Sequence, residues 1–281
     1  MSVLLEPLSY AFMVRGMIAA VLVGIVCAVV GTYVVLRGMA FFGDALAHTM
    51  LPGIALGYLI SGGARDILFW WALGTAIVAA LGIGAISKNA EIREDTAIGI
   101  IFAGMFALGI ALISTVRSYA VDLSHFLFGD VLSVSTRSLW LILTFGGIVL
   151  LTVFAFYKEF MTLSFDPILA VTLRLPVGML NNLLLALIAV TVAVSLQTVG
   201  VALMVAMLVT PAATAYLLTN RLFTMMLLAA LIASLSGVIG LYLSFYLNVA
   251  SGAAIVLTAT VFFILAFGWR KARGGNAIIR G

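Results

Sequence analysis

The sequence has very little charge for its length. Asp, Glu, Lys and Arg make up 9% of the 281 residues, whereas 65% are hydrophobic. A soluble globular protein is closer to about one quarter charged and one half apolar. This composition excludes an ordinary soluble domain. The formal net charge of +4 gives no sign of a nucleic-acid partner, because the positive residues fall largely in loops and tails.

Other absences narrow the class further. A single cysteine, Cys27, excludes an internal disulfide framework. The sequence contains neither a GxxxxGK[ST] loop for binding ATP nor the HExxH motif of a zinc protease, so we do not expect this chain to be an enzyme. The N-terminal MSVLLEPLSY lacks both the positive region and the cleavage site of a signal peptide, and none is expected.

The chain does contain apolar runs of about 20 residues, each long enough to cross a hydrocarbon core of about 30 Å. Because lipid offers no hydrogen-bond partner to the backbone, such runs are expected to be helices. We therefore predict an all-α polytopic membrane protein with a single transmembrane domain over 1–281. About nine spans are expected, with eight as the alternative; they are 16–36, 39–60, 67–86, 96–114, 137–157, 178–197, 200–218, 223–246 and 251–269.

The orientation is predicted from Lys and Arg, which concentrate on the cytoplasmic side of membrane proteins. The strongest positive cluster is the C-terminal tail, with Arg270, Lys271, Arg273 and Arg280. We therefore expect the C-terminus to be cytoplasmic. Alternation of the spans then places 87–95 and 158–177 in the cytoplasm, and 61–66 and 115–136 outside.

The two cytoplasmic segments are interpreted differently. The charged stretch SKNAEIREDT (87–96) is interpreted as a solvated loop. In the segment 158–177, Asp166 and Pro167 predict the start of a short helix, with Asp as the N-cap and Pro in the first turn. Pro176 is expected to end it. A short capped helix between two spans can serve as a docking element.

The stretch GDALAHTMLPG (43–53) places an acid and an imidazole inside a predicted span. Asp44 and His48 stand at i and i+4, so on a helix they share one face. An ionisable group inside a membrane is expensive and is a functional site by default. A carboxylate and an imidazole suit divalent manganese, iron and zinc, although the residue types alone do not choose between a metal and a proton. The alternative is an Asp–His hydrogen bond that only fixes packing.

A second acid–imidazole pair lies in the outer segment. Asp122 and His125 form the sequence DLSH, at i and i+3. They are candidates for a gate at the outer mouth of a pore, but a hydrogen bond that stabilises the loop is the favoured interpretation.

Five stretches follow one another in a recognisable order: RGMAFFGDALAHTMLPGIALG (37–57), EDTAIGIIFAGMFALGIALIS (94–114), DLSHFLFGDVLSV (122–134), SFDPILAVTLRLPV (164–177) and SLQTVGVALMVAMLVTPAATAYL (195–217). Together they resemble the membrane permease subunits of bacterial ABC importers for manganese, iron and zinc ions. The resemblance covers nearly the whole chain. It implies the fold of the type II ABC importers and a place in the bacterial plasma membrane.

The resemblance also implies partners and site residues. The partners would be a second copy of the permease, two cytoplasmic ATPase subunits that bind the ATP, and an extracellular or periplasmic metal-binding protein. Asp44 and His48 would coordinate the transported ion in the pore. A coupling helix would dock into the ATPase; its residues are Asp166, Pro167, Ala170, Leu173 and Pro176.

Two departures from the family and one motif refine the expectation. Ala47 stands where the family often has Ser, which implies one pore hydroxyl fewer, and Arg174 stands where it often has Gly, which implies an added charge at the ATPase interface. The sequence DLSHFLFGDVL resembles that of the manganese and iron members more than that of the zinc members. The prediction is therefore a manganese importer, with ferrous iron second. Zinc import, a proton-coupled secondary carrier and a non-transporting scaffold are the alternatives.

Overall fold

The structure is a computed structural model that describes residues 6–62, 65–90, 92–115 and 131–272. Within these ranges every regular element is a helix, which confirms the all-α prediction. Eight of the helices are long and apolar enough to cross a membrane: α2 (Ala11–Leu36), α5 (Arg65–Asn89), α6 (Glu94–Ser114), α8 (Thr136–Ala155), α11 (Val177–Val199), α12 (Val201–Leu218), α13 (Leu222–Leu247) and α14 (Ser251–Ala272).

The remaining elements are short. They are the 3₁₀ turns η1 (Pro7–Ser9) and η2 (Val131–Ser133), and the helices α3 (Phe42–Thr49), α4 (Leu51–Ser61), α9 (Tyr157–Phe165) and α10 (Pro167–Thr172). The segment 116–130, which holds Asp122 and His125, lies outside the described residues.

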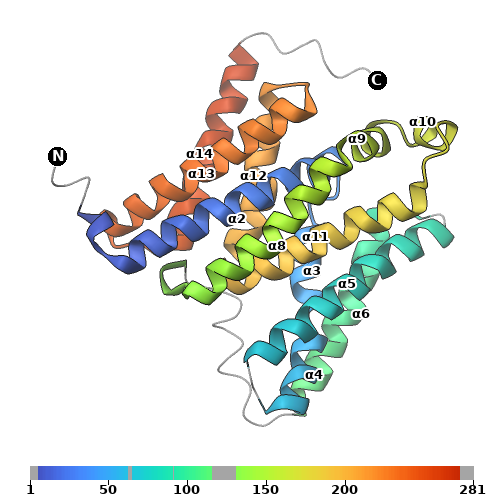
Figure 1. Ribbon diagram of the computed structural model, residues 1–281, viewed down its shortest axis with the longest axis horizontal. Coiled ribbons are helices and arrows are strands. Elements are labelled where there is room, and N and C mark those ends of the chain that lie inside the picture. The colour runs from blue at the N-terminus through green and yellow to red at the C-terminus, as the bar shows by residue number, and fades with distance from the viewer. Residues whose placement is uncertain (1–5, 63–64, 91, 116–130, 273–281) are drawn as a thin grey trace.

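The helices form two groups joined along the middle of the molecule (Figure 1). In one group α2 packs against α12 and α13, and α14 packs against both of these. In the other group α4 packs against α5 and α6. α11 contacts α5 on one side and α2 and α8 on the other, so it connects the groups, and α3 lies beside it in the centre.

The predicted span 39–60 is the one that differs from a continuous helix. It is interrupted at Met50, between α3 and α4, so the count of nine continuous spans is wrong for the described chain and the alternative of eight holds. Pro52 lies in the first turn of α4. It has no N–H to bond the carbonyl of His48 four residues earlier, which explains why the helix is broken at this point.

Close helix packing holds the broken segment in place. A Cβ atom on Gly53 would overlap the Thr75 side chain and the Trp71 carbonyl of α5, and one on Gly57 would press on the Trp71 side chain. These two glycines therefore let α4 and α5 approach closely, as small residues four positions apart do in membrane helices.

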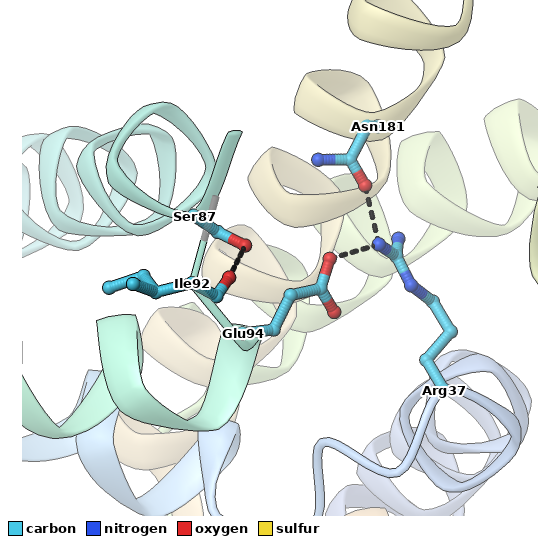
Figure 2. A network of polar contacts seen from close by, with 5 residues as sticks. All are labelled: Arg37, Ser87, Ile92, Glu94 and Asn181. Atoms are coloured by element: carbon cyan, nitrogen blue, oxygen red, sulfur yellow. Dashed lines mark hydrogen bonds and ion pairs between the residues drawn. The ribbon is translucent and has the colours of Figure 1, made fainter. Parts of the chain in front are cut away.

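The segment predicted as a solvated loop, 87–96, is mostly helical. α5 continues to Asn89 and α6 begins at Glu94. Ser87 Oγ donates a hydrogen bond of 3.0 Å to the carbonyl of Ile92, which closes the connection (Figure 2). Glu94 forms an ion pair with Arg37 and is only partly exposed, so the solvated-loop interpretation is wrong for this residue.

Candidate functional site

The chain turns back into the membrane region between α2 and α3. Gly38 has φ +71°, a left-handed conformation that glycine adopts without steric strain. The amide of Met39 donates to the carbonyl of Val34 at 2.9 Å, which closes the end of α2. α3 then starts at Phe42 and packs against α5, α6, α11 and α12.

α3 is buried on all sides but one. Six of its eight residues are buried, and the two that are not are Asp44 and His48. The predicted sharing of one helix face is therefore observed. The side chain of Asp44 is 42% exposed and that of His48 is 24% exposed. Ala47 is buried at 3% exposure and belongs to the packed side, so a hydroxyl at that position would not share this face.

The geometry of the pair argues against a purely structural hydrogen bond. Asp44 Oδ1 and His48 Nε2 are 3.7 Å apart, which is too far for a hydrogen bond between an imidazole and a carboxylate. The other ring nitrogen, His48 Nδ1, is buried and has no hydrogen-bond partner in the described part of the chain. Asp44 and His48 are therefore not hydrogen-bonded to each other, and the carboxylate and Nε2 stay available to another ligand.

Two aromatic rings of α6 surround the imidazole. The His48 ring lies 5.8 Å from that of Phe102 and 5.4 Å from that of Phe106, at interplanar angles of 69° and 81°. The two phenyl rings stack on each other at 5.7 Å and 15°. Such edge-to-face contacts restrain a ring's orientation. Sequence reasoning missed both residues, although their i, i+4 spacing in α6 was readable.

One chain supplies only part of a coordination shell. Among the residues described here, no cluster of three or more His, Cys, Asp or Glu side chains can hold a metal ion. Asp44 and His48 offer one carboxylate and one imidazole, both suitable for first-row divalent ions, and such ions take four to six ligands. The arrangement therefore fits a site of transient binding that needs ligands from water, carbonyl groups or another protein chain.

The predicted short helix at Asp166 is present as α10. Asp166 Oδ1 accepts a hydrogen bond of 2.9 Å from the amide of Leu169, as an N-cap does. The helix ends at Thr172 rather than at Pro176. The amide of Leu175 bonds the carbonyl of Ala170 at 3.0 Å, and Arg174 takes the left-handed conformation with φ +56°. This turn ends α10, and Pro176 instead precedes α11.

α10 presents an apolar surface. Ile168 is 81% exposed, Val171 64% and Leu173 57%, while Ala170 is fully buried. Of the predicted coupling residues, Leu173 is accessible, whereas the side chain of Ala170 packs inside the chain. Ile168 and Val171 share the exposed surface and were not among the predicted residues. The coupling role of this segment stays a prediction. Beside α10 lies a groove of about 610 Å³ between α9 and the start of α13.

These features can be compared with known proteins. The family model described as the ABC 3 transport family matches residues 9–270. The manganese transport system membrane protein MntC of Halalkalibacterium halodurans is 47% identical over 269 residues, which cover 96% of this chain and 91% of that protein. The chelated iron transport system membrane protein YfeD of Yersinia pestis is 38% identical over 265 residues, 94% of this chain and 88% of that one.

A solved structure agrees with the sequence relatives. PsaBC from Streptococcus pneumoniae in complex with Fab matches with a TM-score of 0.79 and 38% sequence identity, over 94% of this chain and 96% of that chain. The family model and the relatives each cover nearly the whole length of the chain. The chain therefore belongs to the ABC 3 transport family.

Proposed function

We propose that this chain is the pore-forming permease of an ATP-driven importer of divalent manganese, and that Asp44 and His48 bind the ion in transit. The observation that carries the proposal is the exposed face of α3, where these two side chains are the only ones of the helix not buried. Relatives named as manganese transport proteins support the choice of metal, and a relative named for iron keeps ferrous iron as the second candidate.

The position of Asp44 supports a hydrated or protein-lined pore. A carboxylate with 42% of its side chain exposed cannot face lipid hydrocarbon without a large free-energy penalty. The exposed face of α3 must therefore face water, an ion or another chain. A second copy related by a two-fold axis would present a second Asp44–His48 pair to the same space, because a two-fold interface repeats each residue on both sides.

The ligand types suit transport rather than storage. A carboxylate and an imidazole, with no thiolate, bind a divalent ion more weakly than a closed cysteine site. Weak binding allows the ion to leave, which conduction requires. Phe102 and Phe106 hold the imidazole in place without competing for the metal, because phenyl rings carry no ligand atom.

The energy source would be a separate subunit. The chain has no phosphate-binding loop of its own. The apolar surface of α10, with Ile168, Val171 and Leu173 exposed, supports a contact with cytoplasmic ATPase subunits. This end of the molecule would then be cytoplasmic. The ring of Phe223, at the start of α13, lies beside that of Tyr157 in α9, so α13 begins at this same end. Because α13 runs away from this end and α14 runs back toward it, the C-terminus would be cytoplasmic too.

The test is ion uptake by the complete importer in proteoliposomes with ATP enclosed. Asp44→Asn and His48→Gln keep the side-chain sizes but remove the ligand chemistry, and each should lower manganese uptake by at least tenfold with the complex still assembled. Asp95→Asn removes an exposed acid elsewhere in the chain, and it should transport normally. Iron and zinc are tested in parallel by direct uptake and by competition.

Other outcomes would contradict the proposal. Normal uptake by both pore variants would show that the Asp44–His48 pair is only structural. Preferential uptake of zinc would contradict the choice of manganese. Uptake that needs a proton gradient but no ATP would indicate a secondary carrier.

A further inference from the structure

Three separate parts of the chain meet at one guanidinium group, that of Arg37, in the turn before α3. Arg37 follows directly after α2, Glu94 is the first residue of α6, and Asn181 lies near the start of α11. Arg37 Nη2 donates to Glu94 Oε1 at 2.5 Å and to Asn181 Oδ1 at 2.6 Å. Figure 2 shows both bonds converging on the same nitrogen.

This contact is half-buried, whereas a neighbouring ion pair is exposed. The side chains of Arg37 and Glu94 are 12% and 29% exposed. Arg93 and Asp95 lie on either side of Glu94 in the sequence, and they form a looser pair of 3.6 Å whose side chains are 87% and 55% exposed. Exposed pairs contribute little free energy, whereas breaking a buried pair leaves a charge without compensation. The start of α6 therefore offers two ion pairs, one half-buried and one exposed, whose acidic residues are neighbours in the sequence.

The Arg37 site is only partly satisfied. Both hydrogen bonds use Nη2, while Nη1 is buried and has no partner among the residues that the structure describes. A buried donor without an acceptor is costly. This arrangement therefore does not use the full bonding capacity of the guanidinium. A contact that leaves one donor unpaired is less stable than a fully paired one, so less free energy is needed to break it.

The three partners connect the elements that the proposed function needs. Arg37 stands seven positions before Asp44, in the turn that starts α3. Glu94 begins the helix whose rings contact His48. Asn181 belongs to α11, which directly follows α10 in the chain and contacts α3 in space. A movement of α10 that shifts the start of α11 must therefore stretch or break the bond to Arg37.

We propose that Arg37, Glu94 and Asn181 are positioning residues for transport. Their shared contact fixes α3 relative to α6 and α11, and it is exchanged in each cycle when the ATPase displaces α10 and α11. The inference rests on the proposed function, because it needs α3 to hold the ion and α10 to meet the ATPase. It adds the link between them, which is a two-state contact that both ends can bias.

The experiment measures the number of ATP molecules hydrolysed for each manganese ion imported, in proteoliposomes that contain the complete importer and its binding protein. Glu94→Gln keeps the shape but removes the charge, and Asn181→Leu removes the second acceptor. Each is expected to raise the ATP-to-manganese ratio at least fivefold. The reason is that the ATPase still hydrolyses ATP, but its movement no longer reaches α3. The controls are Asp95→Asn at the exposed pair and Asn182→Leu at the exposed neighbouring amide, and both should keep the wild-type ratio.

A structural role and a coupling role give different results. If the contact only stabilises the fold, uptake and hydrolysis fall together with the yield of assembled complex, and the ratio stays at the wild-type value. An unchanged ratio in the variants that assemble would overturn the inference. If Glu94→Gln does not assemble, Asn181→Leu provides the test. Arg37→Gln removes the donor of both hydrogen bonds, so it should raise the ratio at least as much as either acceptor variant, and adding Glu94→Gln to it should change the ratio no further.

Failure of the proposed function would be recognised separately. In that case the wild-type complex would import no manganese with ATP, or Asp44→Asn would import it normally, whatever the Glu94 variant does. If manganese import depends on Asp44, but Glu94→Gln and Asn181→Leu both keep the wild-type ratio of ATP to manganese, only the further inference is contradicted.

Discussion

α3 and α10 are both short helices, and each carries a surface that does not suit its surroundings. α3 lies among the membrane helices and exposes a carboxylate and an imidazole, Asp44 and His48. α10 lies at one end of the molecule, where it exposes Ile168 and Val171, with Leu173 exposed at its C-cap. Polar groups within a membrane and apolar groups facing water both indicate that something else normally covers them.

The difference between the two helices lies in what can cover them. The α3 face needs opposite charge or water at a few defined atoms, so a small ion satisfies it. The α10 face needs apolar area, which another protein surface supplies. Changes in α3 should therefore alter ion transport with assembly intact, whereas changes in α10 should alter assembly first.

The largest effect is expected at Ile168, the most exposed apolar residue of α10 at 81%. Ile168→Asp should remove about 2 kcal/mol of favourable free energy that comes from apolar burial in the complex, and it adds the free-energy cost of desolvating a charge. Association with the ATPase should fall by more than about thirtyfold, since each 1.4 kcal/mol is a factor of about ten. The measurement is the amount of ATPase that co-purifies with the tagged permease, together with manganese uptake.

The matched control is Ile168→Leu, which keeps the apolar volume and should retain the ATPase. Folding of the Asp variant is checked by its elution as a single species in detergent. Unchanged co-purification of the ATPase with Ile168→Asp would show that α10 is not part of the interface. The contrast between α3 and α10 would then be wrong.

A smaller effect is expected at Phe106, which contacts the His48 ring from α6. Phe106→Leu keeps an apolar side chain but removes an edge-to-face contact, which contributes about 0.5–1.5 kcal/mol. The KM for manganese should rise about two- to tenfold. The maximal rate and the co-purified ATPase should stay the same, because the change affects only the orientation of a ligand.

Leu108 provides the control for this variant. It lies on the same helix with 49% exposure, and Leu108→Ala should leave the KM unchanged. A fall in maximal rate at constant KM in Phe106→Leu would show that the ring moves during transport rather than holding His48 in place.

Local signals in the sequence predicted local features well. The N-cap of α10 depends on neighbouring residues, Asp166 and Leu169, and it was predicted correctly. The separation of the spans 178–197 and 200–218 was also predicted, and the structure places it at Gly200, the single residue between α11 and α12. The i, i+4 relation of Asp44 and His48 needed only helical geometry.

Features that depend on distant residues were not predictable in the same way. Arg37 and Glu94 are 57 positions apart, and nothing local pairs them. α6 is apolar nearly all round, so its sequence does not indicate which side faces His48. The break at Met50 is different, because it has a local signal in Pro52; it was not predicted because α3 and α4 together form one apolar run. Asp122 and His125 lie outside the described residues, and their role as a gate stays a prediction.

The smallest effect is expected at Arg174, which ends α10 with φ +56°. A left-handed backbone costs a non-glycine residue about 1 kcal/mol, so Arg174→Gly should stabilise this turn. The amide of Leu175, bonded to the carbonyl of Ala170, should then exchange its hydrogen about two- to fivefold more slowly. Hydrogen–deuterium exchange of the purified permease measures this.

Arg174→Gln separates backbone from charge, because it removes the cation and keeps a side chain on the left-handed residue. An exposed charge contributes at most about 1 kcal/mol to an interface, so both variants should weaken ATPase association by less than about fivefold and reduce its dependence on salt. Only the Gly variant should slow exchange at Leu175. Equal exchange in the two variants would show that the left-handed backbone carries no penalty here, and a much larger loss of ATPase in both would mean that α10, like α3, depends on a specific charge as well as on apolar area.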